Sequence, residues 1–166
     1  MRLGFAAHPA QTAGMKALAA ETGKMFADEG IVAAAAKYAD APMRQTHKNK
    51  DPRGWAEFAR MLAEHSAEGH ALTMLNVQLK RPTLWEMEAD LRKFTLPLLV
   101  VVGDEDFPCL EGSLFLKRTV PTAGLLVVPR SGHTITSEEP AVFNAALAEL
   151  FAATEAGRWM SHRPSH

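Results

Sequence analysis

Two short runs of branched apolar residues limit most strongly what this chain can fold into. They are PLLVVVG at 97–103 and GLLVVP at 124–129, and continuous apolar character of this kind is typical of strands buried on both faces of a parallel sheet. A helix is expected between them at about 110–119, and another within SEEPAVFNAALAELFAA at 137–153. The order strand, helix, strand, helix predicts a βαβ crossover with a covering helix, and therefore part of an α/β sheet.

The preceding half of the chain has a different character. Up to about residue 93 it is rich in Ala, Met, Glu and Lys and has no β-branched run, a composition that favours helices. The polar stretch THKNKDPRG at 46–54 is expected to be a loop. Helices are expected at about 10–28, 31–39, 52–66, 69–79 and 84–92. The predicted organisation is a helical domain at 1–93, a sheet-containing domain at 94–155 and a flexible tail at 156–166.

Some apolar side chains of the helical half recur at helical spacing. Trp55, Phe58 and Leu62 stand at i, i+3 and i+7 and form one apolar stripe. We interpret this stripe as core packing rather than as the lining of a ligand site. For Trp85 and Met87 we expect packing within this helical half, and the lining of an acyl pocket is the alternative.

Charge and composition exclude several classes of partner. The 166 residues carry 18 Lys and Arg against 19 Asp and Glu, with no dense basic run, so nucleic acid is not an expected partner. No apolar run is long enough to span a bilayer, and the first residues do not resemble a signal peptide. The single cysteine, Cys109, excludes an internal disulfide, and the histidines lack metal-ligand spacing. We therefore expect a cytoplasmic protein with no metal, cofactor or membrane partner.

Chemically active side chains follow both predicted strands. Asp104, Glu105 and Asp106 come directly after the first strand, and His133 follows the second within PRSGH. The carboxyl ends of parallel strands meet at one edge of a sheet, which is where ligands bind in such folds. A carboxylate that accepts the Nδ1 proton of an imidazole fixes its tautomer and stabilises the imidazolium form. The spacing therefore predicts an acid–histidine pair at this edge.

Two segments carry a resemblance to a known family. VPRSGHTITSEEPAVFN at 128–144 resembles the histidine segment of the α/β-hydrolase superfamily, and LPLLVVVGDEDFP at 96–108 resembles its acid segment. The resemblance covers about residues 95–153. It implies that the catalytic acid is Asp106, not Asp104, that His133 is the general base, and that the helical half is the lid.

The superfamily also requires a nucleophile on a G-x-S-x-G turn upstream of the lid. The 166 residues of this sequence contain no such turn. We therefore expect the C-terminal portion of a hydrolase of small esters or related substrates, inactive alone because members of a catalytic unit act together. The first strand would then have an unpaired apolar edge. A second copy of the chain or a missing N-terminal portion is expected to cover that edge.

Other interpretations of the same residues remain open at this point. The D-x-D spacing of Asp104 and Asp106 is also found in Mg²⁺-dependent phosphotransferases that use an aspartate nucleophile, and a hydrolase scaffold can serve as a non-catalytic interaction module. Asp106 could cap the following helix, and His133 could be a solvated loop residue. Cys109, near a helix start, could act as a thiol nucleophile.

Overall fold

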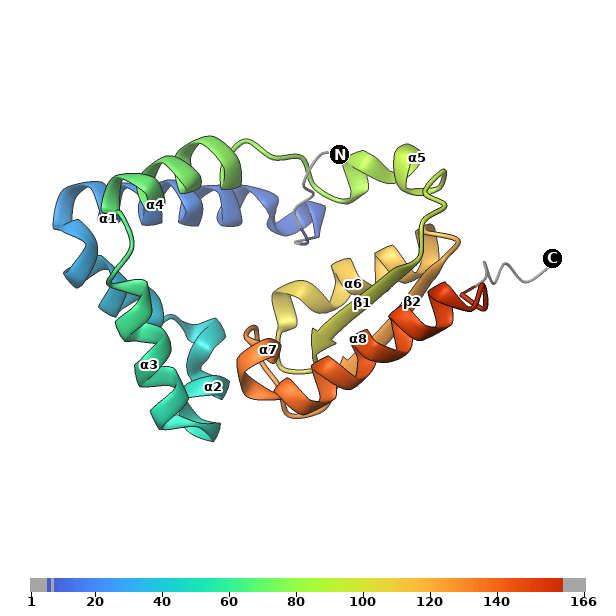
Figure 1. Cartoon of the computed structure of the whole chain (residues 1–166). Coiled ribbons are helices and arrows are strands. Elements are labelled where there is room, and N and C mark those ends of the chain that lie inside the picture. The colour runs from blue at the N-terminus through green and yellow to red at the C-terminus, as the bar shows by residue number, and fades with distance from the viewer. Residues whose placement is uncertain (1–5, 7, 160–166) are drawn as a thin grey trace.

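The computed structural model describes residues 6 and 8–159 of the chain. We call residues 8–93 the helical part and residues 94–159 the strand part (Figure 1). The helical part contains α1 (Thr12–Ala39), α2 (Gln45–Lys50), α3 (Pro52–Leu62), α4 (Ala67–Thr73) and α5 (Glu88–Leu91), with 3-10 turns at Pro9–Gln11, Pro42–Arg44 and Trp85–Met87 and a π-helical turn at Met74–Gln78. The strand part contains β1 (Leu98–Gly103), α6 (Phe107–Thr119), β2 (Ala123–Val128), α7 (Ile135–Glu138) and α8 (Pro140–Glu155).

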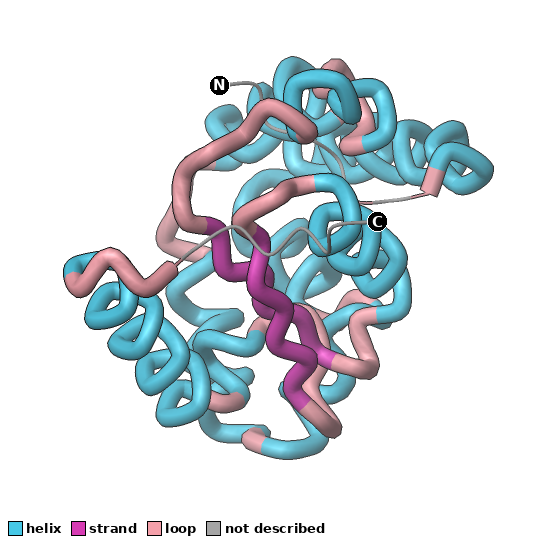
Figure 2. Tube along the Cα trace, turned by 90° about the vertical axis from the view of Figure 1, so that its right-hand side faces the viewer, coloured by secondary structure: helices cyan, strands magenta, loops and turns pink. Residues whose placement is uncertain are grey.

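The strand part contains the predicted crossover. β1 and β2 pair in parallel, with Val100 opposite Leu125 and Gly103 opposite Val128, and α6 packs against both strands (Figure 2). This confirms the α/β class. Because the register brings the last residues of both strands to the same edge, the loops that follow them begin side by side.

Burial of the strands is less complete than their composition predicts. Val100, Val102 and Val128 are buried, but Val127 of β2 is 43% exposed and Phe151 of α8 is 58% exposed. The prediction of strands buried on both faces is therefore wrong for part of β2. The described residues leave apolar surface of the strand part open to solvent.

The predicted last helix is divided in two. α7 ends at Glu138 and α8 begins at Pro140, with Glu139 in a non-helical conformation between them. Proline fits the first turn of a helix, where its missing N–H has no partner to lose, so Pro140 starts a new helix rather than continuing α7. α8 then runs across the strand part (Figure 1).

The helical part is held together by small and aromatic side chains. α1 is interrupted at Gly30, whose φ of 78° and ψ of 173° are not helical, as the predicted division between 10–28 and 31–39 requires. After this break, Ala35 and Ala39 pack against Leu62 of α3. Trp55 and Phe58 pack on the same cluster, which confirms the interpretation of the apolar stripe as core.

The predicted loop at 46–54 is wrong. Residues 45–50 form α2 and residues from Pro52 onward form α3, so that Asp51 alone separates two helices. Its carboxylate accepts a hydrogen bond from the Gly54 N–H at 2.9 Å and caps α3. Pro52 is therefore a helix start rather than a loop signal.

The helical and strand parts meet at two places. α2 lies beside α7 (Figure 1), and the ring of Trp85 stacks on Phe115 of α6 with centroids 4.7 Å apart. Trp85 thus packs between the two parts, whereas the sequence predicts packing within the helical half alone.

At the C-terminal end, the indole N–H of Trp159 donates to the Thr122 carbonyl at 2.8 Å. The rest of the predicted tail, residues 160–166, lies outside the described residues. Among the helices that the structure describes, none combines the length and the apolar character needed to cross a membrane.

Candidate active site

The three consecutive acids after β1 have three different partners. Asp104 Oδ1 accepts from the backbone N–H of Ser131 at 3.2 Å, which fixes the loop after β2. Glu105 Oε2 accepts from Thr46 Oγ1 at 2.6 Å, which fixes α2 of the helical part. Asp106 Oδ2 accepts from His133 Nδ1 at 2.8 Å. The three carboxylates therefore connect the end of β1 to the loop after β2 and to α2.

Gly103 allows the two loops to come this close. A Cβ atom at this position would lie 2.1 Å from the Ser131 carbonyl oxygen and 2.5 Å from that of Gly132. The same Ser131 oxygen accepts a hydrogen bond from the Glu105 N–H at 2.9 Å. We call residues 129–134, between β2 and α7, the histidine loop. A residue with any side chain at position 103 would push the histidine loop away from the acids.

Glu138 holds the histidine loop from its other side. Its carboxylate accepts hydrogen bonds from the Gly132 N–H at 2.8 Å, the Thr134 N–H at 3.0 Å and the Thr134 hydroxyl at 2.9 Å. These donors directly flank His133. Sequence reasoning did not assign Glu138 this role, because the contact depends on how α7 turns back.

Lys50 is a second residue that sequence reasoning missed. Its ammonium group donates to the Arg130 carbonyl at 2.7 Å and to Glu139 Oε1 at 2.5 Å, so α2 is tied to the histidine loop. Arg130 has a φ of 55°, a left-handed conformation that is uncommon for a residue with a side chain. Because 46–54 was expected to be a loop, Lys50 gave no signal of a contact with this site.

Asp106 and His133 form the pair that the sequence predicts. Asp106 is 6% exposed, while the His133 side chain is 38% exposed and lines a cavity. Asp106 makes no capping bond to α6, so its side chain is committed to the imidazole. A carboxylate only accepts hydrogen bonds, and the neutral ring must therefore carry its proton on Nδ1, leaving the Nε2 lone pair to act as a base.

Cys109 lies beside this pair but has the wrong ionisation for a nucleophile. Its Sγ is 3.9 Å from His133 Nδ1. Burial, together with the negative charge of Asp106, raises the pKa of the Cys109 thiol to about 12. The thiol is therefore protonated at neutral pH, the opposite of an activated thiolate.

The same three residues are the candidate metal ligands of the described chain. The ligand atoms of Asp106, Cys109 and His133 lie within 4.8 Å of one another. Metal binding would have to displace the proton of the Cys109 thiol, and use of His133 Nδ1 as a ligand would break its hydrogen bond to Asp106. These residues therefore fit an acid–base pair better than a metal centre.

Asp104 and Asp106, the two aspartates that a Mg²⁺-dependent phosphotransferase would use together, have separate partners in this structure. Asp104 Oδ1 accepts from a backbone N–H of the histidine loop, and Asp106 is bonded to His133. Among the described residues, Asp104 belongs to no group of metal-ligating side chains. The geometry gives no support to a magnesium-dependent phosphotransferase.

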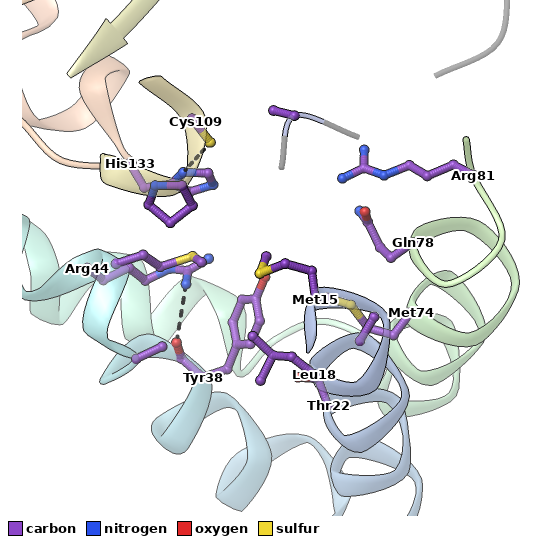
Figure 3. Close-up of a pocket in the computed structure, with 15 residues that line it drawn as sticks. Met15, Leu18, Thr22, Tyr38, Arg44, Met74, Gln78, Arg81, Cys109 and His133 are labelled. Carbon is purple, nitrogen blue, oxygen red and sulfur yellow. Dashed lines mark hydrogen bonds between the residues drawn. The ribbon is translucent and has the colours of Figure 1, made fainter. Parts of the chain in front are cut away.

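A cavity of about 220 Å³ opens between the helical part and the strand part, next to His133 (Figure 3). Most of its walls are apolar. Its lining includes Met15, Leu18, Tyr38, Met43, Arg44, Met74, Gln78, Arg81, Pro108, Cys109 and His133. Trp85 and Met87 are not among the lining residues.

The sequence matches no family model and no curated protein at a significant level. Solved structures do match. MenH from S. aureus superposes with a TM-score of 0.79 at 14% identity, over 89% of this chain and 55% of that chain. A thermophilic esterase from Thermogutta terrifontis gives 0.69 at 22% identity, over 89% and 53%. Est816, described as an N-acyl homoserine lactone degrading enzyme, gives 0.55 at 21% identity, over 77% and 50%.

All three of these structures have the α/β-hydrolase fold. This chain has part of that fold. The α/β-hydrolase portion present here consists of the helices and the parallel strand pair, and the chain spans about half the length of each matching structure. The fold expected from the acid and histidine segments is thus confirmed. At these identities the comparisons show the fold and leave the activity to be argued from the site.

Proposed function

We propose that Asp106 and His133 are the acid and the general base of a hydrolase triad whose nucleophile lies outside these 166 residues. The observation that carries the proposal is the 2.8 Å bond from a buried carboxylate to an imidazole that lines a cavity. The proposed substrate is a small ester or a related acyl compound. The α/β-hydrolase fold supports this class, because its known members include an esterase and a lactone-degrading enzyme.

In this mechanism the proton moves at one atom. His133 Nε2 takes the proton of the nucleophile's hydroxyl as its oxygen attacks the substrate carbonyl. Asp106, held on Nδ1, stabilises the imidazolium that results. The imidazolium then gives the proton to the leaving alcohol oxygen as the carbon–oxygen bond breaks. A water molecule deprotonated by His133 hydrolyses the acyl intermediate in the same way.

The nucleophile would arrive on a segment that pairs with the free edge of β1. In the described residues, the sheet consists of β1 and β2 alone, and two parallel strands make a poor sheet. Phe107 and Leu114 of α6 are 74% and 40% exposed, which is unusual for large apolar side chains next to a strand pair. We propose that N-terminal strands of an α/β-hydrolase cover this surface, and that a second copy of the chain is the alternative occupant.

A chimera tests the proposed function. The chain alone is expected to hydrolyse p-nitrophenyl butyrate at the background rate. Fusion to the portion of the Thermogutta terrifontis esterase that this chain does not cover is expected to give turnover. Substitution His133→Ala in the chimera should lower that turnover by about 10²-fold or more, because it removes the general base. A folded chimera whose turnover is unchanged by His133→Ala would refute the proposal.

A further inference from the structure

One charged side chain that lines the cavity, that of Arg44, has no carboxylate partner among the described residues. Arg44 stands at the end of the Pro42–Arg44 turn and is 6% exposed. Among the described residues no carboxylate lies within 4.0 Å of its guanidinium, although the exposed arginines Arg60 and Arg92 are both paired. Burying a cation without an opposing charge is costly, and arginine is rarely buried unless it is paired.

The protein holds this guanidinium by its faces rather than by its N–H groups. The Cζ atom lies 4.2 Å from the centroid of the Tyr38 ring and 5.5 Å from that of Phe58. Ring faces stabilise a cation but accept few of its five N–H donors. Nη1 reaches the Tyr38 carbonyl at 3.5 Å, and the buried Nε has no hydrogen-bond partner among the described residues. Arg44 is thus held in place with donor capacity unused.

The other residues that line the cavity indicate which kind of ligand would accept hydrogen bonds from Arg44. Arg44 and His133 lie close together on one side, and Arg81 lies on the opposite side (Figure 3). Between them the wall is apolar and includes Met15, whose flexible thioether side chain adapts to different shapes. The volume of about 220 Å³ is below the range of about 300–1,000 Å³ typical of ligand sites, so the occupant is small.

We infer that this cavity binds a small apolar carboxylic acid, with its carboxylate on Arg44. A planar carboxylate matches the guanidinium fork and supplies one negative charge for one buried positive charge. A planar carboxylate also leaves an apolar remainder of the molecule to contact the apolar part of the wall, which a free phosphate ion does not have. Together with the proposed function, this makes the substrate an ester or lactone that carries a free carboxylate, with its reacting carbonyl at His133.

Binding can be measured on the chain itself by NMR titration. The probes are hexanoate and its neutral analogue hexanamide, at pH 7. We expect hexanoate to bind about tenfold or more tightly than hexanamide and to shift the Arg44 Nε–H resonance, because the bond is charge-assisted. Arg44→Gln should remove this preference. The matched control Arg92→Gln, on an exposed arginine paired with Glu88, should keep it.

Two further variants keep the inference open to refutation. Arg44→Met preserves the apolar packing on Tyr38 and is used if Arg44→Gln does not fold. Equal binding of hexanoate and hexanamide, or unchanged hexanoate binding in either folded Arg44 variant, would overturn the inference. His133→Ala is expected to keep the preference for hexanoate, since Arg44 rather than His133 binds the carboxylate.

The inference and the proposed function can fail separately. If hexanoate binds through Arg44 but the chimera has no His133-dependent turnover, the proposed function is wrong and the anion site stands. If the chimera turns over p-nitrophenyl butyrate through His133 but the cavity shows no preference for hexanoate, the anion site is wrong and the proposed function stands.

Discussion

The histidine loop and the helical part are stabilised in different ways. The loop around His133 is fixed through its backbone: Asp104 and Glu138 accept hydrogen bonds from its N–H groups, and Lys50 donates to one of its carbonyls. The helical part is stabilised by clusters of apolar side chains such as Phe26 with Ala34 and Ala71. Directional bonds fix the positions of reacting atoms, whereas apolar packing tolerates changes in shape. We therefore expect the position of His133 to be fixed more precisely than the positions of side chains in the helical part.

Two glycine substitutions should give the largest contrast between the parts. Gly103→Ala places a Cβ atom 2.1 Å from the Ser131 carbonyl oxygen, and we expect the free energy of unfolding to fall by about 4 kcal/mol or more, or the chain not to fold. Gly14→Ala in α1 meets no atom within 4 Å, and we expect a gain of about 0.5–1 kcal/mol. Urea denaturation measures both. Equal effects of the two substitutions would remove the contrast.

A second pair of variants compares two glutamates. Glu138→Gln weakens three hydrogen bonds to the histidine loop, and we expect a loss of about 2 kcal/mol because each bond is charge-assisted. Glu57→Gln alters an exposed ion pair with Arg60 on α3, and we expect no measurable loss. Thermal unfolding measures stability, and hydrogen exchange of the Thr134 amide reports the loop directly. An unchanged exchange rate in Glu138→Gln would show that the carboxylate does not hold the loop.

The last prediction concerns alkaline pH. The pKa of the Cys109 thiol is raised from its ordinary value of 9.0 to about 12 in the folded chain. Above pH 9 the thiol ionises in the unfolded chain but not in the folded one, so stability should fall as the pH rises from 9 towards 12. Cys109→Ala lacks this contribution. We therefore expect its stability to fall less steeply than that of the parent chain across this window, measured by urea denaturation, and equal slopes would contradict the account.

The sequence predicts the strand part better than the helical part, for a physical reason. The short apolar runs that end at Gly103 and before Pro129 predict strands. Because the ends of parallel strands meet at one edge of a sheet, the acid and the histidine that follow these strands are predicted to lie close together. In the helical part, Gly30 was identified correctly as a break because its backbone needs a positive φ. α2 was missed because its residues are polar and are held by bonds to a distant loop.

The individual contacts of the site were less predictable than its position. The roles of Lys50 and Glu138 depend on how α2 and α7 face the histidine loop, which no local pattern encodes. The burial of Arg44 without a carboxylate partner among the described residues is likewise a property of the folded chain, since a buried arginine cannot be recognised from its neighbours in sequence.

The proton position on His133 tests the central claim most directly. A ¹⁵N NMR spectrum of the imidazole distinguishes a ring protonated on Nδ1 from one protonated on Nε2. The account predicts a neutral ring with its proton on Nδ1, shared with Asp106, and loss of that preference in a folded Asp106→Ala variant. A folded parent chain whose neutral His133 carries its proton on Nε2 would contradict the proposed acid–base pair.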